Sequence, residues 1–227
     1  MTRKTNARIA GVTFLFYIAA GVLSMVLFGR AASGDGIGEK LAAIAQHSTD
    51  VRIVVVLGLL EAFCALVLGV TLYAITREQD PDLAMLGLVS RVGEGVIGAS
   101  IPVALGLLWL ATASGANAPD APTARGLAAF LLRVDGWGTL ISATFFAVGS
   151  TFFSWLLLRG RMIPLTLAWL GVGGSMLLVA CLPLQLAGFL SGPLTSLMWI
   201  PIAVFEVVLA LWLLVKGVAP PARSQST

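Results

Sequence analysis

Six apolar runs fill most of this sequence, and each is long enough to cross a lipid bilayer. They cover residues 9–29, 51–76, 83–112, 126–158, 163–190 and 194–215. One membrane-spanning helix needs about 20 consecutive apolar residues, and a single segment can satisfy its own backbone hydrogen bonds in lipid only as a helix. The predicted fold class is therefore all-α, a polytopic integral membrane protein. We expect one six-transmembrane-helix bundle over residues 1–218 and a disordered tail over residues 219–227.

The overall composition excludes most other classes of protein. Apolar residues make up 58% of the chain and charged residues only 11%, whereas a soluble domain has about 45–50% and about 25%. A soluble enzyme, a secreted disulfide scaffold, a coiled coil and a disordered chain are thereby excluded. The first apolar run, residues 9–28, is longer than the core of a cleaved signal peptide, so we interpret it as a retained anchor.

Residues that usually bind nucleic acid, metals or cofactors are few or poorly placed. The net charge is +3, but the basic residues are scattered in short turns, so we expect no nucleic-acid partner. His47 is the only histidine, and Cys64 and Cys181 both lie within apolar runs. We therefore expect no metal, no haem or other cofactor and no disulfide. The bilayer itself is the expected partner, together with a small hydrophobic ligand or a lipid.

The distribution of Lys and Arg at the span ends predicts the orientation. Cytoplasmic ends of spans are enriched in these residues. With the N-terminus inside, eight basic residues lie on the cytoplasmic side and four on the outer side, so we expect both termini in the cytoplasm. The inner set is Arg3, Lys4, Arg8, Arg77, Arg159, Arg161, Lys216 and Arg223, and the outer set is Arg30, Lys40, Arg52 and Arg125.

The connection after the first span contains a second kind of helix. Ile37, Leu41 and Ile44 recur at helical spacing, which predicts a short amphipathic helix at the membrane interface. Pro102, Pro183 and Pro201 fall in the outer halves of their spans. Ordinary kinked packing explains this placement, and so does a vestibule that opens outward under the segment Ile37–Gln46.

Several local sequences resemble one family. The resemblance covers about residues 7 to 218, with Ser154-Trp155 in place of the expected Gly-Tyr, which we interpret as a packing substitution. The family is a bacterial six-span membrane group named domain of unknown function 4386. This resemblance implies a six-span fold in the bacterial inner membrane and leaves the function open. The residues that carry it are Arg8-Ile9-Ala10-Gly11, Phe145-Phe146-Ala147, Ser154-Trp155-Leu156, Arg159-Gly160-Arg161-Met162-Ile163-Pro164 and the block from Glu206 to Gly217.

Charged residues at membrane depth are the candidates for function, because each costs about 2.5–3.5 kcal/mol at the centre of a span. Arg133 and Asp135 lie in the outer part of the fourth span. Two interpretations stay open for this pair. The side chains snorkel to the interface, or they form an outer gate beside Gly136 and Gly138.

Four further charges are predicted near the middle of the membrane. Glu61, Glu94 and Glu206 each fall within roughly 5 Å of the midpoint of a span, and Arg91 can pair with Glu94 at i,i+3. Three carboxylates and one guanidinium leave two excess negative charges, so we expect at least one acid to be protonated at neutral pH. A shared phrase, Glu-x-x-x-Ala-Leu-x-Leu, begins at Glu61 and at Glu206 and predicts similar depths on parallel helices.

These four residues, Glu61, Arg91, Glu94 and Glu206, support three hypotheses. The first is binding or transport of a small hydrophobic or protonatable ligand at a polar site, in which Arg91 keeps Glu94 ionised while Glu61 or Glu206 exchanges a proton. The second is a structural or accessory protein whose acids lock helix packing. The third is an intramembrane acid/base enzyme on a lipid-soluble substrate, which requires a carboxylate pair in one enclosed pocket.

Overall fold

The predicted six-helix membrane bundle is confirmed in a computed structural model that describes residues 1–98, 101–115 and 118–219. Within these residues, six helical segments are long and apolar enough to cross a membrane. They are α1 (Arg3–Ala31), α3 (Ser48–Thr76), α4 with α5 (Pro81–Gly98 and Ile101–Thr112), α6 (Ala121–Arg159), α7 (Leu165–Leu186) and α8 with α9 (Leu194–Leu197 and Ile200–Val215). The short α2 (Ile37–Gln46) joins α1 to α3.

Helix ends follow local sequence signals. Asp120 caps α6 by accepting a hydrogen bond from the Thr123 N–H at 2.9 Å. Asp80 accepts from the Leu83 N–H at 3.1 Å at the start of α4, where Pro81 needs no intrahelical partner for its nitrogen. The predicted tail over residues 219–227 lies outside the described residues, apart from Ala219.

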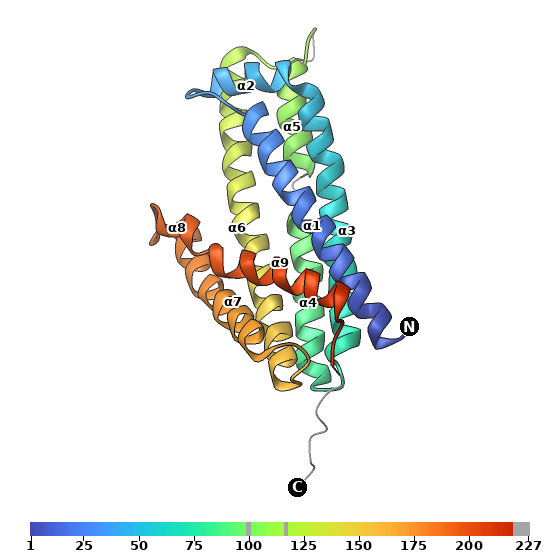
Figure 1. Cartoon of the computed structure of the whole chain (residues 1–227). Coiled ribbons are helices and arrows are strands. Elements are labelled where there is room, and N and C mark those ends of the chain that lie inside the picture. The colour runs from blue at the N-terminus through green and yellow to red at the C-terminus, as the bar shows by residue number, and fades with distance from the viewer. Residues whose placement is uncertain (99–100, 116–117, 220–227) are drawn as a thin grey trace.

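The six spans form a closed ring in the order α1, α3, α4, α6, α7, α9, in which α9 packs back against α1. The ring is confined to one end of the molecule, because α7 runs along only part of α6 and α9 crosses the bundle obliquely (Figure 1). At the other end, α2 lies across α5 and the first half of α6 (Figure 1). The phrase shared by Glu61 and Glu206 therefore does not mark parallel helices, since α9 crosses α3 rather than running beside it.

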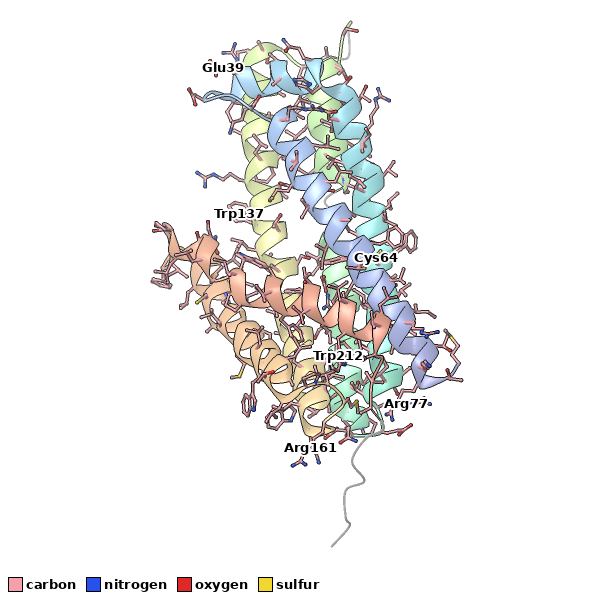
Figure 2. The ribbon with its side chains drawn as sticks, in the orientation of Figure 1. Glu39, Cys64, Arg77, Trp137, Arg161 and Trp212 are labelled. Carbon is pink, nitrogen blue, oxygen red and sulfur yellow. The ribbon has the colours of Figure 1, made fainter. Side chains whose placement is uncertain are left out.

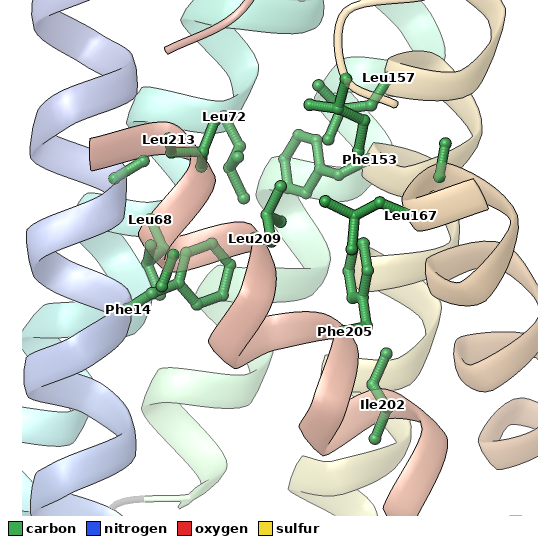
Figure 3. Close-up of a cluster of buried hydrophobic side chains, with 14 of the residues drawn as sticks. Phe14, Leu68, Leu72, Phe153, Leu157, Leu167, Ile202, Phe205, Leu209 and Leu213 are labelled. Atoms are coloured by element: carbon green, nitrogen blue, oxygen red, sulfur yellow. The ribbon is translucent and has the colours of Figure 1, made fainter. Parts of the chain in front are cut away.

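A cluster of apolar side chains lies in the interior of the ring. Phe14 of α1, Leu68 and Leu72 of α3 and the residues of α9 around Leu209 are buried together (Figure 3). A close helix contact permits this packing. A Cβ atom at Gly11 would lie only 2.7 Å from the carbonyl oxygen of Ala210, so α1 and α9 approach at a distance that only glycine allows.

A second apolar cluster lies at the opposite end, under α2. Ile44 is fully buried there, and Ile37 and Leu41 pack against the same cluster, which includes Leu107 of α5 and Ala124 of α6. The helix predicted at residues 37–46 is present, but its apolar face contacts protein. The amphipathic pattern alone does not distinguish a lipid partner from a protein one.

Ion pairs join the ends of neighbouring helices. Arg30 of α1 binds Asp50 of α3 at 2.6 Å near α2. At the other end, Arg3 lies 3.3 Å from Glu78 and Arg159 lies 3.5 Å from Asp80. These pairs are partly exposed, so each adds little to stability. They fix which helix ends lie side by side.

Candidate functional site

Arg91 of α4 lies at the centre of the ring and is only 1% exposed. Its Nη1 donates hydrogen bonds to both carboxylate oxygens of Glu94, at 2.9 and 3.2 Å. Its Nη2 donates to the Ser150 hydroxyl of α6 at 3.1 Å and lies 3.5 Å from Oε1 of Glu206 on α9. A buried guanidinium is tolerated only where such partners surround it. One side chain thus connects α4, α6 and α9.

Aromatic rings complete the surroundings of this guanidinium. Its Cζ lies 4.8 Å from the ring centroid of Phe146 and 5.7 Å from that of Phe14, both within cation–π range. The aliphatic part of Arg91 has room because Gly69 of α3 faces it, and a Cβ there would lie 3.1 Å from the Arg91 Cβ. Burial of Arg91 therefore depends on neighbours from α1, α3 and α6.

Glu94 has the most hydrogen bonds of the three acids. The Tyr17 hydroxyl of α1 donates to its Oε1 at 2.5 Å, in addition to the two bonds from Arg91. The Ser142 hydroxyl of α6 donates to the Glu94 backbone carbonyl at 3.0 Å. Arg91 and Tyr17 therefore hold the Glu94 carboxylate in place, while Ser142 binds the backbone of the same residue.

Glu206 is buried with fewer partners. Its residue is 7% exposed, and within the described part of the chain its Oε1 accepts no hydrogen bond. The nearest donor, Nη2 of Arg91, is directed to Ser150. A buried oxygen without a hydrogen bond is costly, so Glu206 keeps an unused capacity to accept one.

The three glutamates meet at a single cavity. Its volume is about 320 Å³, and it lies between α1, α3, α4, α6 and α9. Two of its described lining residues, Gly98 of α4 and Thr139 of α6, are exposed, so the cavity reaches the molecular surface at these positions. Glu61 is half-buried there and accepts a hydrogen bond from the Ser24 hydroxyl at 2.7 Å. The described lining residues are Tyr17, Gly58, Glu61, Ala62, Ala65, Glu94, Gly95, Gly98, Thr139, Ser142, Ala143, Phe146, Trp199 and Glu206.

The structure brings the four mid-membrane residues of the sequence prediction together, but it separates them from the predicted outer gate. Arg91, Glu94 and Glu206 form one ion-paired cluster, and Glu61 shares the cavity with the two acids. Arg133 is exposed on α6 and Asp135 is half-buried there. Neither is among the residues that line the cavity.

The sequence left open an outward vestibule under the segment Ile37–Gln46, which forms α2. None of the described lining residues comes from α2, so α2 is no lid over this cavity. Among the residues that the structure describes, no group of three or more His, Cys, Asp and Glu side chains is placed to hold a metal ion.

Sequence reasoning missed several polar and aromatic partners. Tyr17 and Ser150 contact the charged cluster, and Ser24 contacts Glu61. Of these, only Tyr17 could have been singled out from the sequence as a polar partner. It is one of two tyrosines in the chain, and its hydroxyl falls inside an apolar run. Serines are tolerated anywhere in a membrane helix, because they can donate to the backbone of the preceding turn.

Comparison with known proteins agrees with the architecture. The family model for a domain of unknown function (DUF4386) matches residues 9–217, which is nearly the whole chain. The chain belongs to this family. The resemblance predicted from the sequence is thereby confirmed. No curated protein and no solved structure matches the chain, and membership in DUF4386 brings no activity with it.

Proposed function

We propose that this DUF4386 protein binds a small hydrophobic or protonatable molecule in the cavity between α1, α3, α4, α6 and α9. The observation that carries the proposal is that Glu61, Glu94 and Glu206 line one cavity of about 320 Å³ at the centre of the spans. Ionisable residues at membrane depth are expensive and generally mark a ligand, ion or proton site. The volume is at the lower end of the range for small-molecule sites.

The hydrogen bonds suggest different roles for the three acids. Glu94 is the fixed anion, because Arg91 and Tyr17 together engage both of its oxygens. Glu61 and Glu206 exchange the proton that accompanies the ligand, because they have fewer donors. Transport would follow if the cavity opened alternately to the two sides of the membrane.

The proposed setting is the bacterial inner membrane, with both termini in the cytoplasm. The start of α1, the turn after α3 and the turn after α6 lie at the same end of the molecule, where Arg77 and Arg161 are found (Figure 2). Basic residues at these ends support a cytoplasmic location. Cysteine labelling at the α5–α6 connection and at the α3–α4 turn tests this, and only the former should react from outside intact cells.

Native mass spectrometry in mild detergent tests binding. The wild-type protein should carry a bound small molecule or lipid, whereas Thr139→Trp should lose it, because Thr139 is exposed at the open side of the cavity. Ile141→Trp is the matched control on the same helix, since Ile141 is 37% exposed and does not line the cavity. Equal occupancy in all three proteins would contradict a site in this cavity.

A structural role is the second candidate function. It is favoured by Arg91, which links α4, α6 and α9 through Glu94, Ser150 and Glu206. If the acids act only as packing locks, Glu206→Gln should lower stability and leave the bound molecule unaffected. The acid/base enzyme meets only part of its requirement, because carboxylates share one cavity but this cavity is open to the surface rather than enclosed.

A further inference from the structure

We propose that the ligand is a lipophilic organic cation, such as an alkyl- or arylammonium compound. Its charged group would lie between Glu61 and Glu206, and its apolar part against the aromatic wall of the cavity. This inference rests on the proposed function, namely that the cavity binds a ligand, and adds the chemical class of that ligand.

The charge of the cavity wall is the first argument. Glu61, Glu94 and Glu206 line the cavity, and no lysine, arginine or histidine is among its described lining residues. Arg91 is adjacent but does not line the cavity, and its single charge is shared by Glu94 and Glu206, so a negative charge remains on the wall even with one acid protonated. Opposite charges attract strongly where water is scarce. A ligand that carries positive charge therefore balances this wall, whereas an anion is repelled.

The second and independent argument is that one carboxylate oxygen of Glu206 can still accept a hydrogen bond. The residue is 7% exposed and lines the cavity, while its Oε1 accepts no hydrogen bond from the described residues. The donors of the Arg91 terminus are directed to Glu94 and Ser150. Arg91 lies 3.5 Å from this oxygen but is shared with Glu94, so a cation at the cavity side would add to the incomplete compensation of the buried Glu206 carboxylate.

The aromatic residues decide which kind of cation fits. Tyr17, Phe146 and Trp199 line the cavity, and the Phe146 and Trp199 rings stack with centroids 6.4 Å apart. Aromatic faces bind alkylammonium groups through cation–π attraction. The rest of the wall is mostly glycine and alanine. Although three carboxylates line the cavity, no group of three or more His, Cys, Asp and Glu side chains among the described residues is placed to hold a metal ion, which argues against a bare divalent cation.

The open side of the cavity fits the same class of ligand. Thr139 is exposed at this opening. On the same stretch of α6, but on other sides of the helix, Trp137, Ile141 and Phe145 are exposed apolar residues. Such a surface faces lipid in a membrane protein. A lipophilic cation that partitions into the bilayer can therefore reach the carboxylates sideways, without crossing the whole molecule.

Three probes of nearly equal shape test the charge requirement. Benzyltrimethylammonium is a permanent cation, neopentylbenzene is its neutral carbon analogue, and phenylmethanesulfonate is an anion. Binding to the full-length protein in lipid nanodiscs is measured by equilibrium dialysis, with empty nanodiscs to subtract partitioning. The cation should bind at least about tenfold more tightly than the neutral analogue, and the anion should not bind.

Glu61→Gln is the decisive variant, because glutamine keeps the acceptor for Ser24 and the variant does not disturb the Arg91 pairs. It should weaken cation binding about tenfold and leave binding of neopentylbenzene unchanged. Asp82→Asn, which removes one carboxylate at an exposed position of α4, is the control and should have no effect.

The outcomes separate this inference from the proposed function. Equal binding of the cation and the neutral analogue, both abolished by Thr139→Trp, would overturn the inference and preserve the proposed ligand site. Tightest binding of the anion would also overturn it. If no probe binds and native mass spectrometry finds no molecule that depends on Thr139, the proposed function fails as well.

Discussion

Replacing Arg91 by methionine should destabilise the protein strongly, because two buried carboxylates would lose their counter-charge. The separations are 2.9 Å to Glu94 and 3.5 Å to Glu206, and Arg91 is 1% exposed, so solvent screens these pairs little. At an effective dielectric constant of about 20, each pair attracts by roughly 5 kcal/mol. Because desolvation offsets much of this attraction, removal of one partner from a buried pair usually costs about 3–5 kcal/mol. We expect a loss of this size.

The assay is unfolding by sodium dodecyl sulfate in mixed micelles, followed by circular dichroism. Glu206→Gln alone should cost less than Arg91→Met, because Arg91 keeps Glu94 and Ser150. In the Arg91→Met background, Glu206→Gln should restore about 0.5–3 kcal/mol, the usual range for coupled neighbours. Arg133→Met, at an exposed position of α6, is the control. Wild-type stability of Arg91→Met, or strictly additive losses in the double variant, would refute the reasoning.

Three further predictions concern other contacts. Gly11→Ala should lower the free energy of unfolding by about 1–3 kcal/mol relative to Gly29→Ala, because a Cβ at Gly11 meets backbone atoms of α9 and one at Gly29 meets nothing within 4 Å. The same unfolding assay decides this, and equal stability would exclude the tight contact. Tyr17→Phe should cost about 1.5–3 kcal/mol by removing a hydrogen bond to a buried carboxylate, and an unchanged unfolding midpoint would contradict this. Hydrogen bonds from the side chain and backbone of Thr123 hold the pKa of Asp120 below its usual value of 3.8. The helix cap should therefore be intact above pH 3.8 and be lost as the pH falls through the lowered pKa. In an NMR titration the Thr123 amide resonance should shift at a pH below 3.8, and Asp120→Asn should abolish this shift.

The apolar pattern predicted the spans because length and hydropathy determine whether a helix can cross the bilayer. The pattern says little about tilt and rotation, which depend on packing against neighbours. Gly11 illustrates the difference. The sequence shows a glycine in an apolar run, whereas the structure shows that its lack of a side chain lets α9 cross α1 at close range.

The candidate site was predictable to the extent that its residues were charged. Arg91 and Glu94 were paired correctly because both belong to one helix, where i,i+3 neighbours must meet. The contact between Arg91 and Glu206 joins α4 to α9, and no local spacing encodes it. The oblique course of α9, which brings Glu206 to Arg91, follows from packing against α1 and α7 rather than from its own sequence.

The position of the two ion pairs along the chain has a consequence for membrane insertion. Arg91 and Glu94 enter the bilayer within one helix, so their charges are already matched when α4 leaves the translocation machinery. Glu206 belongs to the last helix and meets Arg91 only when α9 docks. A lone carboxylate is costly in lipid, which favours rapid docking of α9 over release into the bilayer. Docking of α9 would therefore both close the helix ring and complete the cavity wall.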